Sequence, residues 1–185
     1  MRKASAAAFA AIAAVGVIAG TAGAATVRTQ GGLDFVPNEF VRDTVRWVPG
    51  HIVVRRGERV RWIDSDKSPD PHTITVAAKR TMPRPGQNLF ECRACELANA
   101  HLEDPSNPES DLAAVRVNRG PAGLNQPGDS LVLVPGGRIA ARVTAAVGRT
   151  LHYICAIHPW MQGSIRVARA GGGGGGAALT GRQHH

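Results

Sequence analysis

Three side chains that can bind a metal ion stand within seven residues near the end of the chain. They are Cys155, His158 and Met161, in the sequence YICAIHPWMQG, and a fourth candidate, His72, lies on an earlier run with strand-like alternation. A thiolate and two imidazoles bind copper strongly, and a weakly bound axial thioether helps to set the redox potential. These residue types therefore predict a mononuclear copper site in which one loop supplies three ligands and a distant strand supplies the fourth.

Four further segments follow one another in an order typical of a known family. They are FVP (35–37), IVVRRGERVRWID (52–64), PHTITV (71–76) and GSIRV (163–167). Together with the spacing Cys-x2-His-x2-Met, they resemble the type 1 blue-copper proteins (cupredoxins), and the short loop is most similar to that of amicyanin. The similarity extends over residues 33–77 and 129–169. The alternatives are a buried thiol beside an unrelated histidine and a copper-free member of the same fold.

The resemblance implies an all-β fold, a Greek-key antiparallel β-sandwich, one type 1 copper ion and no catalytic residues. It also implies that the ring edge of His158 reaches the surface, where redox partner proteins dock. Trp160 either extends that apolar patch or packs over the loop. Asp64 stands where the family commonly has an asparagine that connects the two ligand loops. An ionised carboxylate accepts hydrogen bonds but cannot donate them, so we expect different hydrogen bonds around the site.

Alternating apolar and polar residues between turns predict many short strands. The candidate strands are 41–47, 51–55, 58–64, 72–77, 130–134, 138–144, 150–155 and 164–169. Short strands separated by turns at this spacing indicate a sandwich. Period-two alternation places Cys155 on the inner face with Tyr153, and His72 on the same face as Ile74. His152 then faces outward and is left out of the site.

Residues 1–24 are predicted to be a secretory signal. Arg2 and Lys3 precede an alanine-rich apolar run that ends in an A-x-A cleavage site, Ala22-Gly23-Ala24. The run falls short of the ~20 residues that span a bilayer, so we expect export to the periplasm or outside the cell. Membrane attachment would follow only if the signal were retained.

The remaining chain is expected to form one domain, residues 25–170, as a monomer. Its positive charge comes from arginines scattered along predicted strands rather than from a dense basic run, which argues against nucleic acid as a partner. That charge instead favours an acidic redox partner. Residues 171–185 begin with six glycines and are expected to form a flexible tail.

An insertion, residues 78–128, separates the two family-like regions and holds a Cys92-x2-Cys95 pair within a stretch that favours a short helix around 92–102. A disulfide suits an exported chain. A second metal site with His101, a redox role and free thiols are the alternatives. A covalent c-type haem would need a histidine directly after Cys95, where Glu96 stands. A disulfide would leave Cys155 as the unpaired thiol for copper.

Three functions can be considered for a copper site of this kind. A one-electron carrier is favoured, because four protein ligands leave no open position for a substrate. A module for copper storage or delivery would usually carry many methionines, and only Met82 and Met161 follow the signal. An enzyme with additional copper ions would need further histidine pairs, whereas the other histidines before the tail are isolated: His51, His101 and His152. The sequence therefore predicts a carrier and not an enzyme.

Overall fold

The computed structural model describes residues 24–66, 69–84, 87–89, 91–107 and 109–169. Apart from Ala24, the predicted signal lies outside these residues, as does the predicted glycine-rich tail. Within the described ranges, no helix has the length and apolar character needed to cross a membrane.

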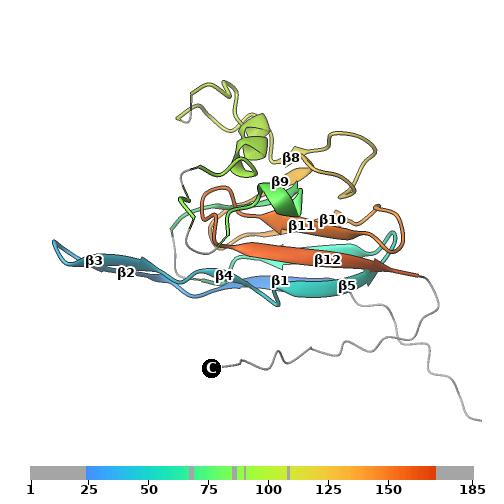
Figure 1. Ribbon diagram of the computed structural model, residues 1–185, viewed down its shortest axis with the longest axis horizontal. Helices are drawn as coiled ribbons and strands as arrows, with labels where there is room; N and C mark the ends of the chain where they lie inside the picture. The colour runs from blue at the N-terminus through green and yellow to red at the C-terminus, as the bar shows by residue number, and fades with distance from the viewer. Residues whose placement is uncertain (1–23, 67–68, 85–86, 90, 108, 170–185) are drawn as a thin grey trace, which may run out of the picture.

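Two β-sheets form the body of the molecule (Figure 1). The first sheet has the order β10-β6-β1-β4 and comprises Arg138–Arg142, Arg59–Ile63, Ala25–Gln30 and Arg46–Val48. The second has the order β5-β12-β11-β7-β9-β8 and comprises His51–Arg55, Gln162–Ala168, Thr150–Ile154, His72–Ala77, Ser130–Leu133 and Arg116–Val117. The third is a separate hairpin of β2 (Leu33–Val36) and β3 (Phe40–Asp43).

The chain passes repeatedly from one sheet to the other, since β4, β5, β6 and β7 alternate between them. The predicted all-β sandwich is confirmed, with one correction to the pairing. β1 pairs with β6 in parallel, and β5 pairs with β12 in parallel. Parallel neighbours need a crossover connection, which the passages through the opposite sheet provide.

The predicted strand 41–47 is wrong as a single element. β3 ends at Asp43 and β4 begins at Arg46, and the two belong to different sheets. The side chain of Asp43 accepts a hydrogen bond from the backbone N–H of Val45 at 2.8 Å. This local bond replaces strand pairing at the junction and turns the chain. The short strands β1, β2 and β8 were not predicted.

The core lies between the two sheets and is built from the inward-facing residues of their strands. Trp62 and Tyr153 are both fully buried in it, with ring centroids 5.9 Å apart in an edge-to-face arrangement. Such edge-to-face contacts are favourable for aromatic rings. The core therefore places Tyr153, two residues before Cys155, against a fixed aromatic neighbour.

The insertion covers the outer face of β7 and packs on the end of β11 in the second sheet. It contains two 3-10 helices, η1 (Lys79–Thr81) and η2 (Cys95–His101), so the short helix expected around residues 92–102 is present as η2. Met82, Cys92 and Ala94 pack against Ala77 of β7 and Ile154 of β11. Every residue of β7 is consequently buried, including the outward-facing ones, because each face of this strand is covered.

Candidate metal centre

The four predicted ligands occupy one end of the second sheet. His72 begins β7, Cys155 directly follows β11, His158 lies on the loop after it, and Met161 immediately precedes β12. The relative exposures are 0% for His72, Cys155 and Met161, and 4% for His158. Two strands of one sheet and the loop between β11 and β12 therefore hold all four residues inside the protein.

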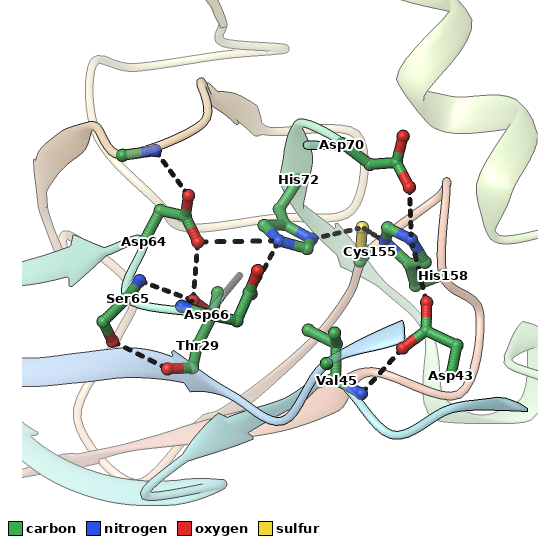
Figure 2. A network of polar contacts seen from close by, with 12 residues as sticks. Thr29, Asp43, Val45, Asp64, Ser65, Asp66, Asp70, His72, Cys155 and His158 are labelled. Atoms are coloured by element: carbon green, nitrogen blue, oxygen red, sulfur yellow. Dashed lines mark hydrogen bonds and ion pairs between the residues drawn. The ribbon is translucent and has the colours of Figure 1, made fainter. Parts of the chain in front are cut away.

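Two imidazole nitrogens and the thiol of Cys155 converge. The Sγ atom of Cys155 lies 3.8 Å from Nδ1 of His72 and 3.7 Å from Nδ1 of His158 (Figure 2). All three atoms lie within 4.8 Å of one another. This spacing lets one ion contact all three atoms, because metal–sulfur and metal–nitrogen bonds are about 2.0–2.3 Å long.

Backbone hydrogen bonds close the loop that carries three of the residues. Cys155 N–H donates to the carbonyl of Met161 at 3.0 Å, and Met161 N–H donates to the carbonyl of His158 at 2.8 Å. The indole of Trp47, from β4 in the opposite sheet, donates to the Met161 carbonyl at 3.2 Å. The loop is thus held by its own backbone and by the facing sheet.

Thr73 connects the two segments that carry the candidate ligands. Its N–H donates to Sγ of Cys155 at 3.3 Å, and its hydroxyl oxygen accepts from the N–H of Ala156 at 2.8 Å. Asp64 makes no such connection: its carboxylate accepts from Thr29 at 2.7 Å and from the N–H of Gly136 at 2.5 Å. The hydrogen bonds do differ from those that an asparagine would make, and the residue after His72 connects the loops.

Carboxylates face the outer nitrogen of each imidazole. Nε2 of His72 lies 3.1 Å from Oδ2 of Asp66, and Nε2 of His158 lies 3.5 Å from Asp43 and 3.7 Å from Asp70 (Figure 2). A carboxylate on one ring nitrogen favours a proton there and leaves the other nitrogen free to bind a metal. In both rings the nitrogen left free is the Nδ1 that faces Cys155.

Sequence reasoning missed these three carboxylates. Asp66 and Asp70 stand within six residues of His72, so proximity along the chain was a usable signal. Asp43 gave no such signal, because its position depends on the β2–β3 hairpin.

The expectation that the edge of His158 reaches the surface is not met. The side chain is only 6% exposed, and Asp43 and Asp70 lie next to its outer nitrogen. Trp160 packs against the His158 ring, with centroids 5.3 Å apart, and is itself 41% exposed. The indole therefore packs over the loop, as one of the two expectations had it, and part of its surface is exposed to solvent.

Burial shifts the pKa values of two of the candidate ligand groups in the direction that favours their neutral forms. It raises the pKa of the Cys155 thiol, an effect that hydrogen bonds from Thr73 and from the loop partly oppose. It lowers the pKa of His158, as does the neighbouring His72, while Asp43 and Asp70 act in the opposite direction. A metal ion must therefore displace the thiol proton of Cys155, but it meets a neutral imidazole at His158.

The other cysteines and histidines lie elsewhere. Cys92 and Cys95 are joined in a disulfide, and Cys155 is the free cysteine. His101 is buried in the insertion, where Nδ1 hydrogen-bonds the Ala114 carbonyl at 2.5 Å. His152 is partly buried on β11 and takes no part in the centre. Among the described residues, the other potential metal-binding group, Asp64 and Asp66 with His72, shares its histidine with this centre.

No family model and no curated protein matches the chain. Solved structures similar to it include a purple cupredoxin from Nitrosopumilus maritimus, with 17% identity over 78% of this chain and 99% of that one (TM-score 0.41). Reduced auracyanin from Roseiflexus castenholzii has 16% identity over 79% of this chain and 99% of that one (TM-score 0.41). Auracyanin A from Chloroflexus aurantiacus, a blue copper protein, has 18% identity over 78% of this chain and 99% of that one (TM-score 0.41). These structural neighbours of the chain are cupredoxins.

Proposed function

We propose that this protein binds one copper ion through His72, Cys155, His158 and Met161 and carries single electrons between redox proteins. The observation that supports the proposal most is the convergence of Sγ and two Nδ1 atoms within 4.8 Å in a fully enclosed position. Copper bound by a thiolate, two imidazoles and a weak thioether supplies a one-electron redox couple.

The residues around the centre fit this role. The donor set is soft, with sulfur and imidazole nitrogen, which favours copper over the oxygen-preferring ions. Thr73 donates an N–H to Sγ of Cys155, which favours the thiolate over the thiol. Strands β7, β11 and β12, together with the hydrogen bonds of the loop, fix the side chains before any ion arrives. In a rigid site the positions of the ligand atoms change little when the copper ion gains or loses an electron.

Burial also separates the carrier from its main alternative, copper storage or delivery. A delivery site must release its ion to another protein, which is easiest when a ligand is exposed. Here His158, the most exposed of the four residues, has 4% of its surface accessible. Electrons can pass through the protein atoms that cover the centre, whereas a copper ion cannot leave unless the loop opens.

Export of the protein is part of the same proposal. The Cys92–Cys95 disulfide supports it, because disulfides persist mainly in oxidising compartments such as the periplasm. The predicted signal, residues 1–24, supports it independently.

Visible and electron paramagnetic resonance spectra of the protein with added Cu(II) test the proposal. We expect an intense thiolate-to-copper band with narrow copper hyperfine splitting, lost in Cys155→Ser. The double variant Cys92→Ser/Cys95→Ser is the matched control, because it removes the other two sulfur atoms and leaves Cys155 in place; it should keep the band. A pale spectrum that is indifferent to Cys155 would show that copper binds elsewhere.

A further inference from the structure

The β2–β3 hairpin forms an arm, residues 33–43, that projects beyond the sandwich (Figure 1). In the described part of the chain, neither of its strands pairs with a strand of the two large sheets. An isolated two-stranded hairpin is at best marginally stable in water. The arm therefore stands out as a segment whose stability and exposure need an explanation.

One face of the arm is apolar and open to solvent. Phe35 and Val41 are directly paired across the hairpin and are 64% and 66% exposed, and Leu33 on the same face is 45% exposed. Exposed apolar residues that gather on one surface mark interaction sites. Phe40 belongs to the opposite face, where it is paired with Val36.

The apolar face of the arm leads to the metal centre. Leu33 is paired with Asp43, so Asp43 lies on the same face as Phe35 and Val41, and its carboxylate lies 3.5 Å from Nε2 of His158. Trp160, which packs on His158, donates its indole N–H to the carbonyl of Val45, two residues after the arm. A molecule seated against the arm and Trp160 would therefore rest directly over His158.

The charge of this region is opposite to that of the rest of the chain. Segments 33–43 and 64–72 hold six carboxylates and two basic residues, a formal charge of −4, whereas the whole chain carries +8. The remainder is therefore at +12. The carboxylates of Asp34 and Glu39 are exposed and that of Asp70 is half-exposed, whereas the side chains of Asp43, Asp64 and Asp66 are at most 12% exposed and act from beneath the surface. Overall charge suggested an acidic partner, but the charge nearest the centre favours a basic one.

We propose that the arm, with Trp160, is the docking surface for a redox protein whose contact face is apolar and ringed by lysines or arginines. The proposal rests on the proposed function only in taking the partner to be a redox protein. A second copy of this chain fits less well, because a two-fold contact would place two acidic arms against each other. An anionic lipid surface would repel the same carboxylates.

Binding of cytochrome c tests the proposal without depending on copper. The probe is a basic cytochrome c, whose haem edge is apolar and ringed by lysines, and its lysine-acetylated form is the control partner. We expect calorimetry at low ionic strength to show binding of the native probe, weakened by salt and by acetylation. Phe35→Ser/Val41→Ser and Glu39→Lys should each raise the dissociation constant about tenfold, the range typical of central apolar contacts and steering charges.

Two variants provide matched controls. Phe40→Ser removes an aromatic ring from the opposite face of the arm, and Glu103→Lys makes the same charge change as Glu39→Lys on an exposed residue of the insertion. Both should bind the probe as the wild type does. Equal effects of the control and arm variants would overturn the proposal, as would loss of self-association or of binding to anionic vesicles in the arm variants alone.

The two proposals fail in different ways. If the arm variants bind the probe normally while the Cys155-dependent copper band is present, the docking surface is wrong and the copper site stands. If the band is missing while probe binding depends on the arm, the docking surface stands and the electron carrier is wrong. The rate at which the copper-loaded protein oxidises reduced cytochrome c, measured by stopped flow, should be lowest for the variants with the highest dissociation constants.

Discussion

The carboxylate of Asp66 lies 3.1 Å from Nε2 of His72, and both side chains are completely buried. A buried carboxylate against a metal-binding imidazole holds the ring in one orientation and increases its basicity. The same carboxylate adds a negative charge close to the centre, which favours the higher oxidation state of a bound ion. Asp66 therefore acts on the candidate centre through His72 without contacting an ion itself.

Asp66→Asn should weaken copper binding and change the balance between oxidation states. Loss of an outer carboxylate partner typically costs about 10–100-fold in metal affinity. Because the lost charge favours Cu(II) over Cu(I), we expect the affinity for Cu(II) to fall more and the reduction potential to rise. Competition with chelators and redox titration measure these changes. Asp111→Asn, an exposed residue in the insertion, is the control; equal affinities in the two variants would contradict the role of Asp66.

The sequence pointed to the residues that converge at the candidate centre because their types and spacing are local properties. His158 and Met161 follow Cys155 by three and six residues, and the alternation of apolar and polar residues alone places His72 and Cys155 on inward faces. The residues around the centre depend on pairings distant in sequence. Asp43 reaches His158 only because the chain turns at Val45 and leaves the arm as a separate hairpin. No period in the sequence encodes that geometry.

Thr73→Val tests whether this threonine connects the ligand loops. Valine keeps the shape of the side chain but removes the oxygen that accepts from Ala156 N–H. A partly buried donor left without a partner costs about 1–3 kcal/mol, so unfolding of the copper-free protein by denaturant should occur at lower concentration. The copper band should also shift, because Ala156 directly follows Cys155: without the bond to the threonine hydroxyl, Cys155 Sγ moves relative to the N–H of residue 73 that donates to it.

Thr26→Val is the control for that experiment, because the hydroxyl of Thr26 makes only a long bond of 3.4 Å to the Ala24 carbonyl at the surface. It should change neither stability nor spectrum. A Thr73→Val protein with the stability and spectrum of Thr26→Val would show that the loops are held without the hydroxyl.

Copper affinity should rise with pH. Protons and copper compete for Sγ of Cys155, and burial raises the pKa of this thiol, so the affinity should increase about tenfold per pH unit through neutral pH. The increase should continue beyond the ordinary thiol range, about pH 8.5. A proton on His158 also competes with copper, but only under more acidic conditions, because the pKa of His158 is lowered. Chelator competition across this range measures the slope; a flat profile at neutral pH would mean that Cys155 is already a thiolate in the copper-free protein.

The raised pKa of Cys155 also makes the stability of the copper-free protein depend on pH, and this stability falls as the pH rises. The folded state holds the Cys155 proton more tightly than the unfolded state does. Stability from this source is therefore fully present below the pKa of an unfolded thiol and is lost as the pH rises toward the folded value. Denaturant titrations should show this alkaline loss in the wild type and a smaller one in Cys155→Ser.

Gly163→Ala should destabilise the fold and disturb the centre. Gly163 is paired with Tyr153 across β11 and β12, and a methyl group there would overlap the Tyr153 ring and hydroxyl. The ring cannot move aside easily, because Trp47 and Trp62 pack against it with centroids 6.0 and 5.9 Å away. Overpacking of this kind costs about 1–3 kcal/mol, which denaturant unfolding measures directly.

A double-mutant cycle locates the cause of that loss. Gly50→Ala is the matched single control, since the closest atom to its added methyl group would be the Trp47 carbonyl oxygen at 3.6 Å, an ordinary contact. Tyr153→Phe removes the hydroxyl, one of the Tyr153 atoms that the methyl group added at Gly163 would meet, and leaves the ring carbons Cζ and Cε1. Gly163→Ala should therefore cost less, but still cost something, in a Tyr153→Phe background. Equal costs in the two backgrounds would show that the hydroxyl does not set the need for glycine. Because Gly163 is two residues from Met161, the partial recovery of stability in the double variant should be accompanied by a partial return of the copper spectrum.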